Sequence, residues 1–187
     1  MSVPTALLII DMQNAVVAGK AAPERQPAVD AAFEACVKRL ARVLYRARNS
    51  DARVVIVQHD GSEGHRLETG TEGWDLRPEF APLRSELVIH KSSSDSFFET
   101  TLGAYLSRLG ILRLVIGGCM TQFCVDTTVR SAVARGYDVT LLGDGHTTGD
   151  QGDLTFEQII AHHNLTLDGF DAGMNEVRLA ACDEVEF

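Results

Sequence analysis

Long apolar runs are missing from this sequence of 187 residues. No window approaches the roughly 18 consecutive apolar residues that a membrane-spanning helix needs. The first residues, MSVPTALLIID, also lack the basic segment and the small-residue cleavage site of a secretory signal. We therefore expect a cytoplasmic chain without a membrane partner, whose first residues form a strand.

Positive charge is also scarce. The chain has 17 Lys and Arg residues against 26 Asp and Glu residues, which gives a formal net charge of −9 and a pI near 5.1. Proteins that bind nucleic acid or anionic membranes carry clustered positive charge, and no basic run is present here. The composition therefore disfavours a nucleic-acid partner and an anionic membrane surface.

Cysteine is sparse, and its spacing fits neither a zinc site nor a disulfide scaffold. The chain has 4 cysteines, and no two of them form a C-x-x-C pair. That pair is the usual unit of structural zinc sites and of thioredoxin-like motifs. Disulfide scaffolds are typically much shorter secreted chains. We therefore expect all four cysteines to be reduced.

What the sequence does contain is an alternation of strand-like and helix-like segments. Hydrophobic residues make up 45% of the chain and charged residues 23%, which suits one domain over residues 1–187 with a substantial core. Short β-branched runs that fit strands buried on both faces occur at residues 6–10, 54–57, 87–89, 112–116 and 139–142. Their alternation with helices predicts an α/β fold with a parallel sheet covered on both faces.

Several segments have the apolar spacing of helices. The first covers residues 29–44 and places Cys36 on its buried side. A second is expected after Ser96, which forms an S-x-x-E capping box with Glu99 and leaves Phe98 on the apolar face. Two further helices are expected at residues 123–136 and 155–167, and Thr155 and Gln158 form a second capping box at the start of the latter. A short strand is expected at residues 176–179.

Three reactive side chains lie where predicted strands end. Asp11 directly follows the first strand, Lys91 lies just beyond the third, and Cys124 comes soon after the fourth. In open α/β sheets, ligands bind beyond the carboxyl ends of the strands, so these side chains are expected at one site. Taken singly, Asp11 also fits a turn or cap, and Lys91 fits a residue that keeps the surface soluble.

The position of Cys124 favours a reactive thiol. It lies in the first turn of a predicted helix, shortly after Gly117 and Gly118. Unpaired N–H groups and the positive end of the helix dipole lower the pKa of a thiol there, and they can also receive an oxyanion. Cys119, nearer the strand, is expected to pack in the core. A second interpretation, in which both cysteines are buried and inert, also fits the composition.

Three sequence blocks together resemble the isochorismatase-like cysteine hydrolases, which include nicotinamidases, N-carbamoylsarcosine amidase and streptothricin-type lactam hydrolases. The blocks are TALLIIDMQN, HKSSSDSFFETTL and GGCMTQFCVDTTVRSAVARGYDV, in family order within residues 5–167. The resemblance implies a three-layer α/β/α, Rossmann-like fold around a six-stranded parallel sheet in the order 3-2-1-4-5-6.

The resemblance also implies roles for individual residues. Asp11, Lys91 and Cys124 match the catalytic triad, and a cis peptide is implied between Cys119 and Met120. The backbone N–H groups of Met120 and Cys124 would form the oxyanion hole. The implied activity is hydrolysis of a C–N bond in a small amide or lactam through a thioester, with no cofactor. Family members usually form dimers, tetramers or larger assemblies, so a homo-oligomer is expected.

One departure from the family concerns metal binding. Nicotinamidases of the family carry an Asp-x-His metal motif after the second strand, but the residue two positions before His59 is Val57. His59, Asp60 and His65 follow in a different order, and hydrogen bonding within the loop is their alternative role. No bound metal is expected.

The walls of the substrate pocket are harder to assign. Candidates are Gln13, Trp74, Phe98 and Phe123, although Gln13 also fits a bond to a neighbouring loop and the aromatics also fit the core. Residues 61–85 have no clear periodicity, and so long a loop is uncommon unless it serves a site. In a homo-oligomer this loop is the candidate for closing a partner's pocket.

Two other functions compete with amide hydrolysis. One is vinyl-ether hydrolysis of the isochorismate type, but the family members with that activity lack the cysteine that matches Cys124. The other is a non-catalytic role as a binding or scaffold subunit. The presence of Cys124 favours the amide chemistry over the first of these.

Overall fold

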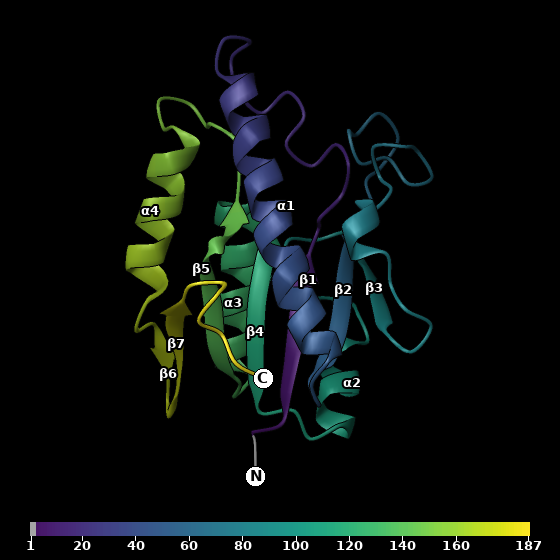
Figure 1. Cartoon of the computed structure of the whole chain (residues 1–187), viewed down its shortest axis with the longest axis vertical. Helices are drawn as coiled ribbons and strands as arrows, with labels where there is room; N and C mark the ends of the chain where they lie inside the picture. The colour runs from purple at the N-terminus through teal and green to yellow at the C-terminus, as the bar shows by residue number, and fades with distance from the viewer. Residues whose placement is uncertain (1–2) are drawn as a thin grey trace.

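Seven strands form one sheet at the centre of the protein, in the order β3-β2-β1-β4-β5-β7-β6. The computed structural model in Figure 1 describes residues 3–187. The strands are β1 (Thr5–Ile10), β2 (Arg53–His59), β3 (Leu87–Lys91), β4 (Arg113–Cys119), β5 (Asp138–Thr147), β6 (Asp171–Ala172) and β7 (Asn175–Ala180). The helices are α1 (Gln26–Arg48), η1 (Pro78–Phe80), α2 (Leu102–Arg108), η2 (Thr121–Val125), α3 (Asp126–Ala134) and α4 (Phe156–Leu167).

The parallel part of the sheet has the expected strand order. β3, β2, β1, β4, β5 and β7 pair in parallel with their neighbours, which is the sequence 3-2-1-4-5-6 when only these strands are counted. The sheet has one strand more than the six that were expected, because β6 pairs antiparallel with β7 at the edge of the sheet. β6 is too short to have a periodic pattern, and the chain turns back to β7 at Gly173, which has a φ of 71°.

Both faces of the sheet are covered by helices, as the apolar runs predicted. All of β1 is buried. Leu7 and Ile9 pack in the cluster that contains the apolar side of α1, whereas Leu8 and Ile10 pack in the cluster that contains α2 and α3. Figure 1 shows α1 crossing one face of the sheet, α2 and α3 behind it, and α4 along the edge near β5 and β7. The three-layer α/β/α architecture is therefore confirmed.

Two helix predictions are confirmed in detail. α1 contains the predicted segment and buries Cys36 completely. At the start of α4, the Thr155 hydroxyl accepts a hydrogen bond from the Gln158 N–H, and the Gln158 side chain accepts one from the Thr155 N–H. This reciprocal pairing satisfies N–H groups that a helix start otherwise leaves without acceptors.

The predicted capping box at Ser96 is wrong. α2 begins only at Leu102, and the Ser96 hydroxyl is instead 2.9 Å from Thr128 Oγ1 in the interior. Glu99 has a φ of 54°, which is not helical, so it does not complete the box. Phe98, expected on the buried face, is 53% exposed. A tertiary hydrogen bond to α3 here replaces the local motif.

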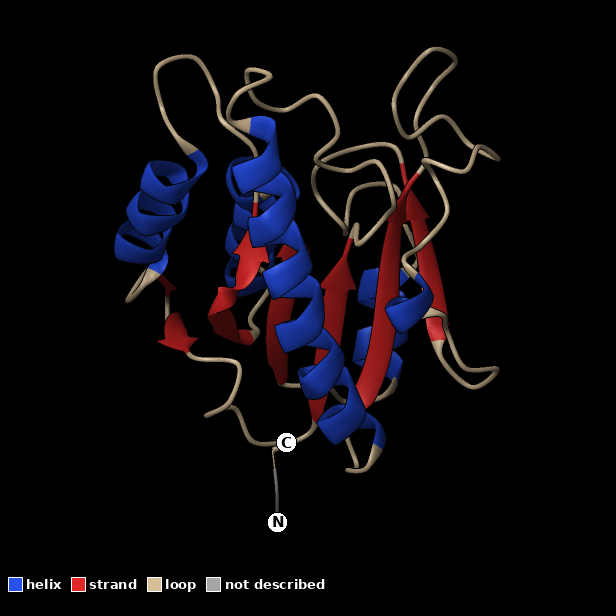
Figure 2. Cartoon of the chain, turned by 45° about the horizontal axis from the view of Figure 1, so that its top comes forward, coloured by secondary structure: helices blue, strands red, loops and turns tan. Residues whose placement is uncertain are grey.

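Long loops gather at the carboxyl ends of the parallel strands (Figure 2). The loop after β2 is tied down by isolated bridges from Gln13 to Leu76 and from Gly61 to Glu68. No helix within residues 3–187 is long and apolar enough to cross a membrane. The cytoplasmic location and the homo-oligomeric state stay predictions.

Candidate active site

The sheet topology places the ends of β1, β3 and β4 at one edge of the molecule. Asp11 immediately follows β1, Lys91 is the last residue of β3, and Cys124 lies in η2, just beyond β4. Asp11 has a φ of 49°, in the left-handed region that residues other than glycine seldom adopt. Its N–H donates to Val57 O at 2.9 Å. This backbone turn keeps the Asp11 side chain at the edge of the sheet.

A glycine at the end of β4 allows two strands to come unusually close. Gly118 has a φ of 134°, and a Cβ atom at this position would lie 2.0 Å from Ile10 O. Only glycine fits here without moving the backbone of β1. The close approach brings the start of η2, and with it Cys124, next to Asp11.

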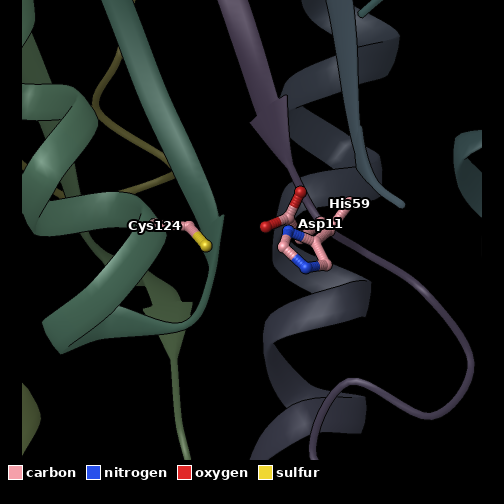
Figure 3. A group of neighbouring side chains, drawn as sticks. All are labelled: Asp11, His59 and Cys124. Atoms are coloured by element: carbon pink, nitrogen blue, oxygen red, sulfur yellow. The ribbon is translucent and has the colours of Figure 1, made fainter. Parts of the chain in front are cut away.

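We call Asp11, Lys91 and Cys124 the strand-end cluster. Lys91 Nζ lies 2.7 Å from Asp11 Oδ2 and 3.2 Å from Cys124 Sγ, and it also donates to Ser93 O at 3.0 Å. The Asp11 and Lys91 side chains are buried, whereas Cys124 is partly exposed. In Figure 3 the Cys124 sulfur faces the Asp11 carboxylate. The structure brings the three predicted residues together, and their catalytic role stays a prediction.

The ionisation of the cluster follows from its burial and its charges. Burial alone would lower the pKa of Lys91, but the Asp11 carboxylate and Cys124 outweigh it and hold that pKa above its ordinary value. Lys91 is therefore an ammonium ion at neutral pH. Asp11 Oδ1 is buried and has no hydrogen-bond partner within residues 3–187, so one oxygen of the carboxylate is free to accept a proton.

The expected thiolate at Cys124 is not the resting state of the site. Burial and the neighbouring Asp11 carboxylate raise the pKa of Cys124 to about 12, although Lys91 opposes them. The expectation from the helix start was therefore wrong in its direction, because it left out the carboxylate that the fold places beside the sulfur. The raised pKa favours the protonated thiol of Cys124 at neutral pH.

The backbone around Cys124 agrees with the expected layout. The peptide between Cys119 and Met120 is cis, and Cys119 is fully buried, as expected. η2 is a single π-helical turn rather than the start of a regular α-helix. Among the loop, turn and cap hydrogen bonds of residues 3–187, the Met120 N–H has no acceptor, so it is available to a ligand oxygen.

A cavity of about 200 Å³ lies over the strand-end cluster. Asp11 and Cys124 belong to its wall, and so do residues from three separate loops. Its lining consists of Asp11, Val16, Lys20, His59, His65, Arg66, Leu67, Ser94, Met120, Phe123 and Cys124. The cavity is smaller than the 300–1,000 Å³ typical of pockets for drug-sized ligands, so it suits a small molecule.

Of the four residues predicted to line the pocket, the structure places only Phe123 there. Gln13 is fully buried below the loop after β2, and Phe98 projects into solvent outside the cavity. Trp74 donates from its indole N–H to Asp60 at 2.8 Å and stacks on His90. Gln13, Trp74 and Phe98 are not among the residues that line this cavity, because loop conformation decides which side chains face it, and their role in substrate binding stays a prediction.

The Gln13 side chain forms hydrogen bonds to the backbone at the end of β2 and in the loop that follows it. Its Nε2 donates to His59 O at 3.0 Å and to Trp74 O at 2.8 Å, and its Oε1 accepts from the His59 N–H at 2.9 Å. These bonds use its amide fully and join the end of β1 to both ends of the loop. The alternative given for Gln13, a bond to a neighbouring loop, is the correct one. The loop itself supplies His65, Arg66 and Leu67 to the cavity of its own chain.

Sequence reasoning missed Lys20 and Arg66, two cations in the cavity wall. Both lie in stretches without helical or strand periodicity, and neither belongs to a recognisable motif. Burial, followed by the nearby Arg66, lowers the pKa of Lys20. The length of the loop after β2 signalled a role at a site for the segment that holds Arg66 but indicated no particular residue, and no signal pointed to Lys20.

Asp11, His59 and Cys124 are the group best placed to hold a metal ion. One donor atom from each lies within 4.8 Å of the others, and Figure 3 shows the His59 ring beside Asp11. However, the Lys91 ammonium already hydrogen-bonds both Asp11 and Cys124, so a metal ion would have to compete with a cation. His65 does not join them, because its Nδ1 accepts from the Leu67 N–H within the loop.

Comparison with known proteins identifies the family. The isochorismatase domain family matches residues 5–161. The chain therefore belongs to the isochorismatase family of hydrolases. A crystal structure of an isochorismatase from Pseudomonas putida has a TM-score of 0.84 and 28% identity, covering 97% of this chain and 90% of that one.

Two curated relatives carry more specific names. Streptothricin hydrolase from Streptomyces noursei is 37% identical over 146 residues, which cover 78% of this chain and 50% of that protein. The chain thus spans about half the length of that relative. The ureidoacrylate amidohydrolase RutB from Serratia proteamaculans is 26% identical over 192 residues, which cover 86% of this chain and 75% of that protein.

Proposed function

We propose that the protein is a cysteine-dependent amidohydrolase that cleaves the C–N bond of a small amide or lactam through a thioester on Cys124. The observation that carries the proposal is the position of Lys91 Nζ, within 2.7 Å of Asp11 Oδ2 and 3.2 Å of Cys124 Sγ below a cavity. One named relative is a hydrolase and another an amidohydrolase, which supports C–N bond cleavage.

The first half of the reaction forms the thioester. Asp11 takes the proton of the Cys124 thiol, and the sulfur attacks the carbonyl carbon of the amide. The negative charge that develops on the carbonyl oxygen is stabilised by the N–H groups of Met120 and Cys124. Asp11 then gives its proton to the leaving nitrogen, and ammonia or an amine departs.

The second half regenerates the enzyme. Asp11 removes a proton from water, the resulting hydroxide attacks the thioester carbonyl, and the C–S bond breaks. The proton on Asp11 returns to the sulfur, and the product leaves as a carboxylic acid. The net reaction adds one water across the C–N bond, so no cofactor or redox partner is required.

Lys91 keeps its charge throughout this cycle. Its ammonium lies between the carboxylate and the sulfur, so it stabilises whichever of them carries the negative charge. A proton can therefore move from Cys124 to Asp11 without leaving an unpaired buried anion. The raised pKa of Lys91 agrees with this role, because it keeps the group cationic across the neutral range.

An ammonia- and amine-release screen over small amides, lactams and carbamoyl compounds tests the proposal. We expect turnover by the wild type and a loss of at least about a thousandfold in Cys124→Ala, since the covalent route is removed. Cys182→Ala is the matched control, because Cys182 is a buried cysteine outside the cavity.

Two results would overturn the proposal. One is release of ammonia at an undiminished rate by Cys124→Ala. The other is hydrolysis of a vinyl ether such as isochorismate by the wild type with no activity on any amide. A folded wild type that cleaves neither class would favour the non-catalytic alternative.

A further inference from the structure

One side of the cavity is lined by side chains with nitrogen donors that form no ion pair with a carboxylate of residues 3–187. Lys20, His65 and Arg66 line the same cavity as Cys124, and we call them the donor rim. Lys20 comes from the loop after β1, and the other two come from the loop after β2. The strand-end cluster and the donor rim therefore face one small space.

The Arg66 side chain is held in place by the backbone. Its Nε donates to Val16 O at 3.0 Å, which fixes the guanidinium in the wall of the cavity. The loop that carries it is tight, since a Cβ atom at Gly61 would lie 2.4 Å from both His65 Nδ1 and Leu67 O. The position of Arg66 is therefore set before any ligand binds.

His65 lies between its own loop and Arg66. Its Nδ1 lies 3.2 Å from the Leu67 N, and its Nε2 lies 3.3 Å from Arg66 Nη1. A neutral imidazole accepts at only one of its two nitrogens, and the other one carries a proton. Burial and the neighbouring Arg66 lower the pKa of His65, which favours the neutral ring. Arg66 Nη2 has no hydrogen-bond partner within residues 3–187, so it can donate to an oxygen bound in the cavity.

The rim also lacks a counter-charge. No carboxylate within residues 3–187 forms an ion pair with Lys20 or Arg66, whereas Arg25, Arg48 and Arg77 all have acidic partners. Asp11 does not supply the missing charge, because Lys91 pairs with it at 2.7 Å. In a chain with a net charge of −9, this cavity is a local concentration of positive charge.

We propose that the donor rim binds a carboxylate of the substrate, so that the substrate is a small amide that also carries a carboxylate. The inference rests on the proposed function and specifies its substrate class. Arg66 and Lys20 supply the charge, His65 adds a neutral ring beside them, and the amide carbonyl lies over Cys124. A guanidinium suits this role because its planar N–H groups match the two oxygens of a carboxylate.

Alkylation of Cys124 by iodoacetate and by iodoacetamide tests the rim without any substrate. Both reagents form an S–C bond and release iodide, and they differ in carrying a carboxylate or a neutral amide. Both rates depend on the fraction of Cys124 that is present as thiolate, so this fraction cancels in the ratio of the two rates. The ratio therefore reports how strongly the site attracts the anionic reagent. The other three cysteines are buried, so the modified site can be followed by peptide mass spectrometry.

We expect the iodoacetate-to-iodoacetamide ratio at Cys124 to exceed that of free glutathione by about tenfold, as one charged hydrogen bond would give. The ratio should fall toward that of glutathione in Arg66→Gln and in Lys20→Gln, recover in part in Arg66→Lys, and decrease with added salt. Arg84→Gln is the matched control, because Arg84 is exposed in the turn before β3, at the opposite edge of the sheet. Thermal melting checks that each variant is folded.

A ratio equal to that of glutathione in the wild type, or one that Arg66→Gln leaves unchanged, would overturn the inference. A second assay compares short amides that end in a carboxylate with their methyl esters. Equal hydrolysis of acids and esters by the wild type would also overturn the inference while the proposed function stands. A high alkylation ratio without hydrolysis of any amide would support the anion site and remove the proposed function.

Discussion

The strand-end cluster and the donor rim line the same cavity but are built by different parts of the fold. Asp11, Lys91 and Cys124 lie at or just beyond the ends of three parallel strands of one sheet, β1, β3 and β4, and two of them are almost completely buried. Lys20, His65 and Arg66 lie in loops that Figure 2 shows above the sheet, and they are only partly buried. Lys91 bonds directly to Asp11 and Cys124, whereas Arg66 bonds to Val16 O and His65 Nδ1 to the Leu67 N–H.

Under the two proposals above, this difference assigns the reaction chemistry to the cluster and the choice of substrate to the rim. The register of the sheet fixes the cluster, so its geometry changes only if the fold changes. The rim depends on loop conformation, which tolerates substitution and insertion more readily than strands do. Relatives that share the cluster can therefore act on different substrates. Variants in the two regions should differ in the same way, with losses of stability and turnover in the cluster and losses of affinity in the rim.

The largest effect is expected from Lys91→Met. The change leaves the Asp11 carboxylate buried without its partner, and removal of one member of a buried ion pair costs about 3–5 kcal/mol. Urea unfolding should show this loss, and amide hydrolysis should fall below detection. Arg178→Met is the control, since Arg178 pairs with Glu176 on the surface and should cost less than about 1 kcal/mol. Equal unfolding free energies for the two variants would contradict the account of the cluster.

A smaller effect is expected from Gln13→Leu, which breaks the link between cluster and rim. The change removes the Gln13 amide from His59 N–H and His59 O and leaves Trp74 O with Gln58 Nε2 as its remaining donor, at a cost of about 2–4 kcal/mol. Loosening the loop after β2 should raise KM more than it lowers kcat, and hydrogen exchange around residues 73–76 should speed up.

Asn14→Ala is the matched control for Gln13→Leu, because it removes an exposed hydrogen bond to the same loop, from Asn14 Nδ2 to Glu72 O. We expect it to cost less than about 1 kcal/mol. If Gln13→Leu leaves both stability and KM unchanged, the loop is held by other contacts.

The smallest effects distinguish two phenylalanines. Phe123 lines the cavity, so Phe123→Ala should lower kcat/KM by about tenfold through lost apolar contact with the substrate. Phe98 is 53% exposed and outside the cavity, so Phe98→Ala should change stability by less than about 0.5 kcal/mol and leave kcat/KM unaltered. Steady-state kinetics on one substrate measures both, and a larger loss in Phe98→Ala would reverse the assignment.

The strand-end cluster could be predicted from the sequence because strands leave a clear signal. The apolar runs before Asp11 and Lys91 mark the ends of β1 and β3, and the two glycines before Cys119 mark the end of β4. Once a parallel sheet is inferred, these ends must meet at one edge. Apolar periodicity also predicted the burial of Cys36, whereas the strand order came from the resemblance to the family, and β6 was missed because it has only two residues.

The rim could not be predicted, because nothing local determines it. Arg66 reaches the cavity because its Nε binds Val16 O, 50 residues earlier in the chain, and because Gly61 permits a tight loop. The false capping box at Ser96 has a related cause, since the Thr128 hydroxyl competes with the local partner. In each case a contact between distant segments outweighs the sequence nearby.

The ionisation of Cys124 was predicted in the wrong direction for the same reason. A helix start favours a thiolate, but the fold adds burial and the Asp11 carboxylate, and these raise the pKa of the thiol. The structure therefore assigns the proton to the sulfur in the resting protein. In the proposed reaction, Asp11 therefore acts as the base that generates the nucleophile.

The most direct test of this account is the pH dependence of Cys124 alkylation by iodoacetamide in the wild type and in Asp11→Asn. Because the thiol has a pKa of about 12, the wild-type rate should rise about tenfold for each pH unit up to pH 10, without a plateau. Asp11→Asn removes a carboxylate that raises this pKa and leaves Lys91, which lowers it, so alkylation at pH 8 should become several times faster while amide hydrolysis is lost. A wild-type plateau near pH 8.5, or an alkylation rate that Asp11→Asn does not change, would contradict the claim that Asp11 controls the proton of Cys124.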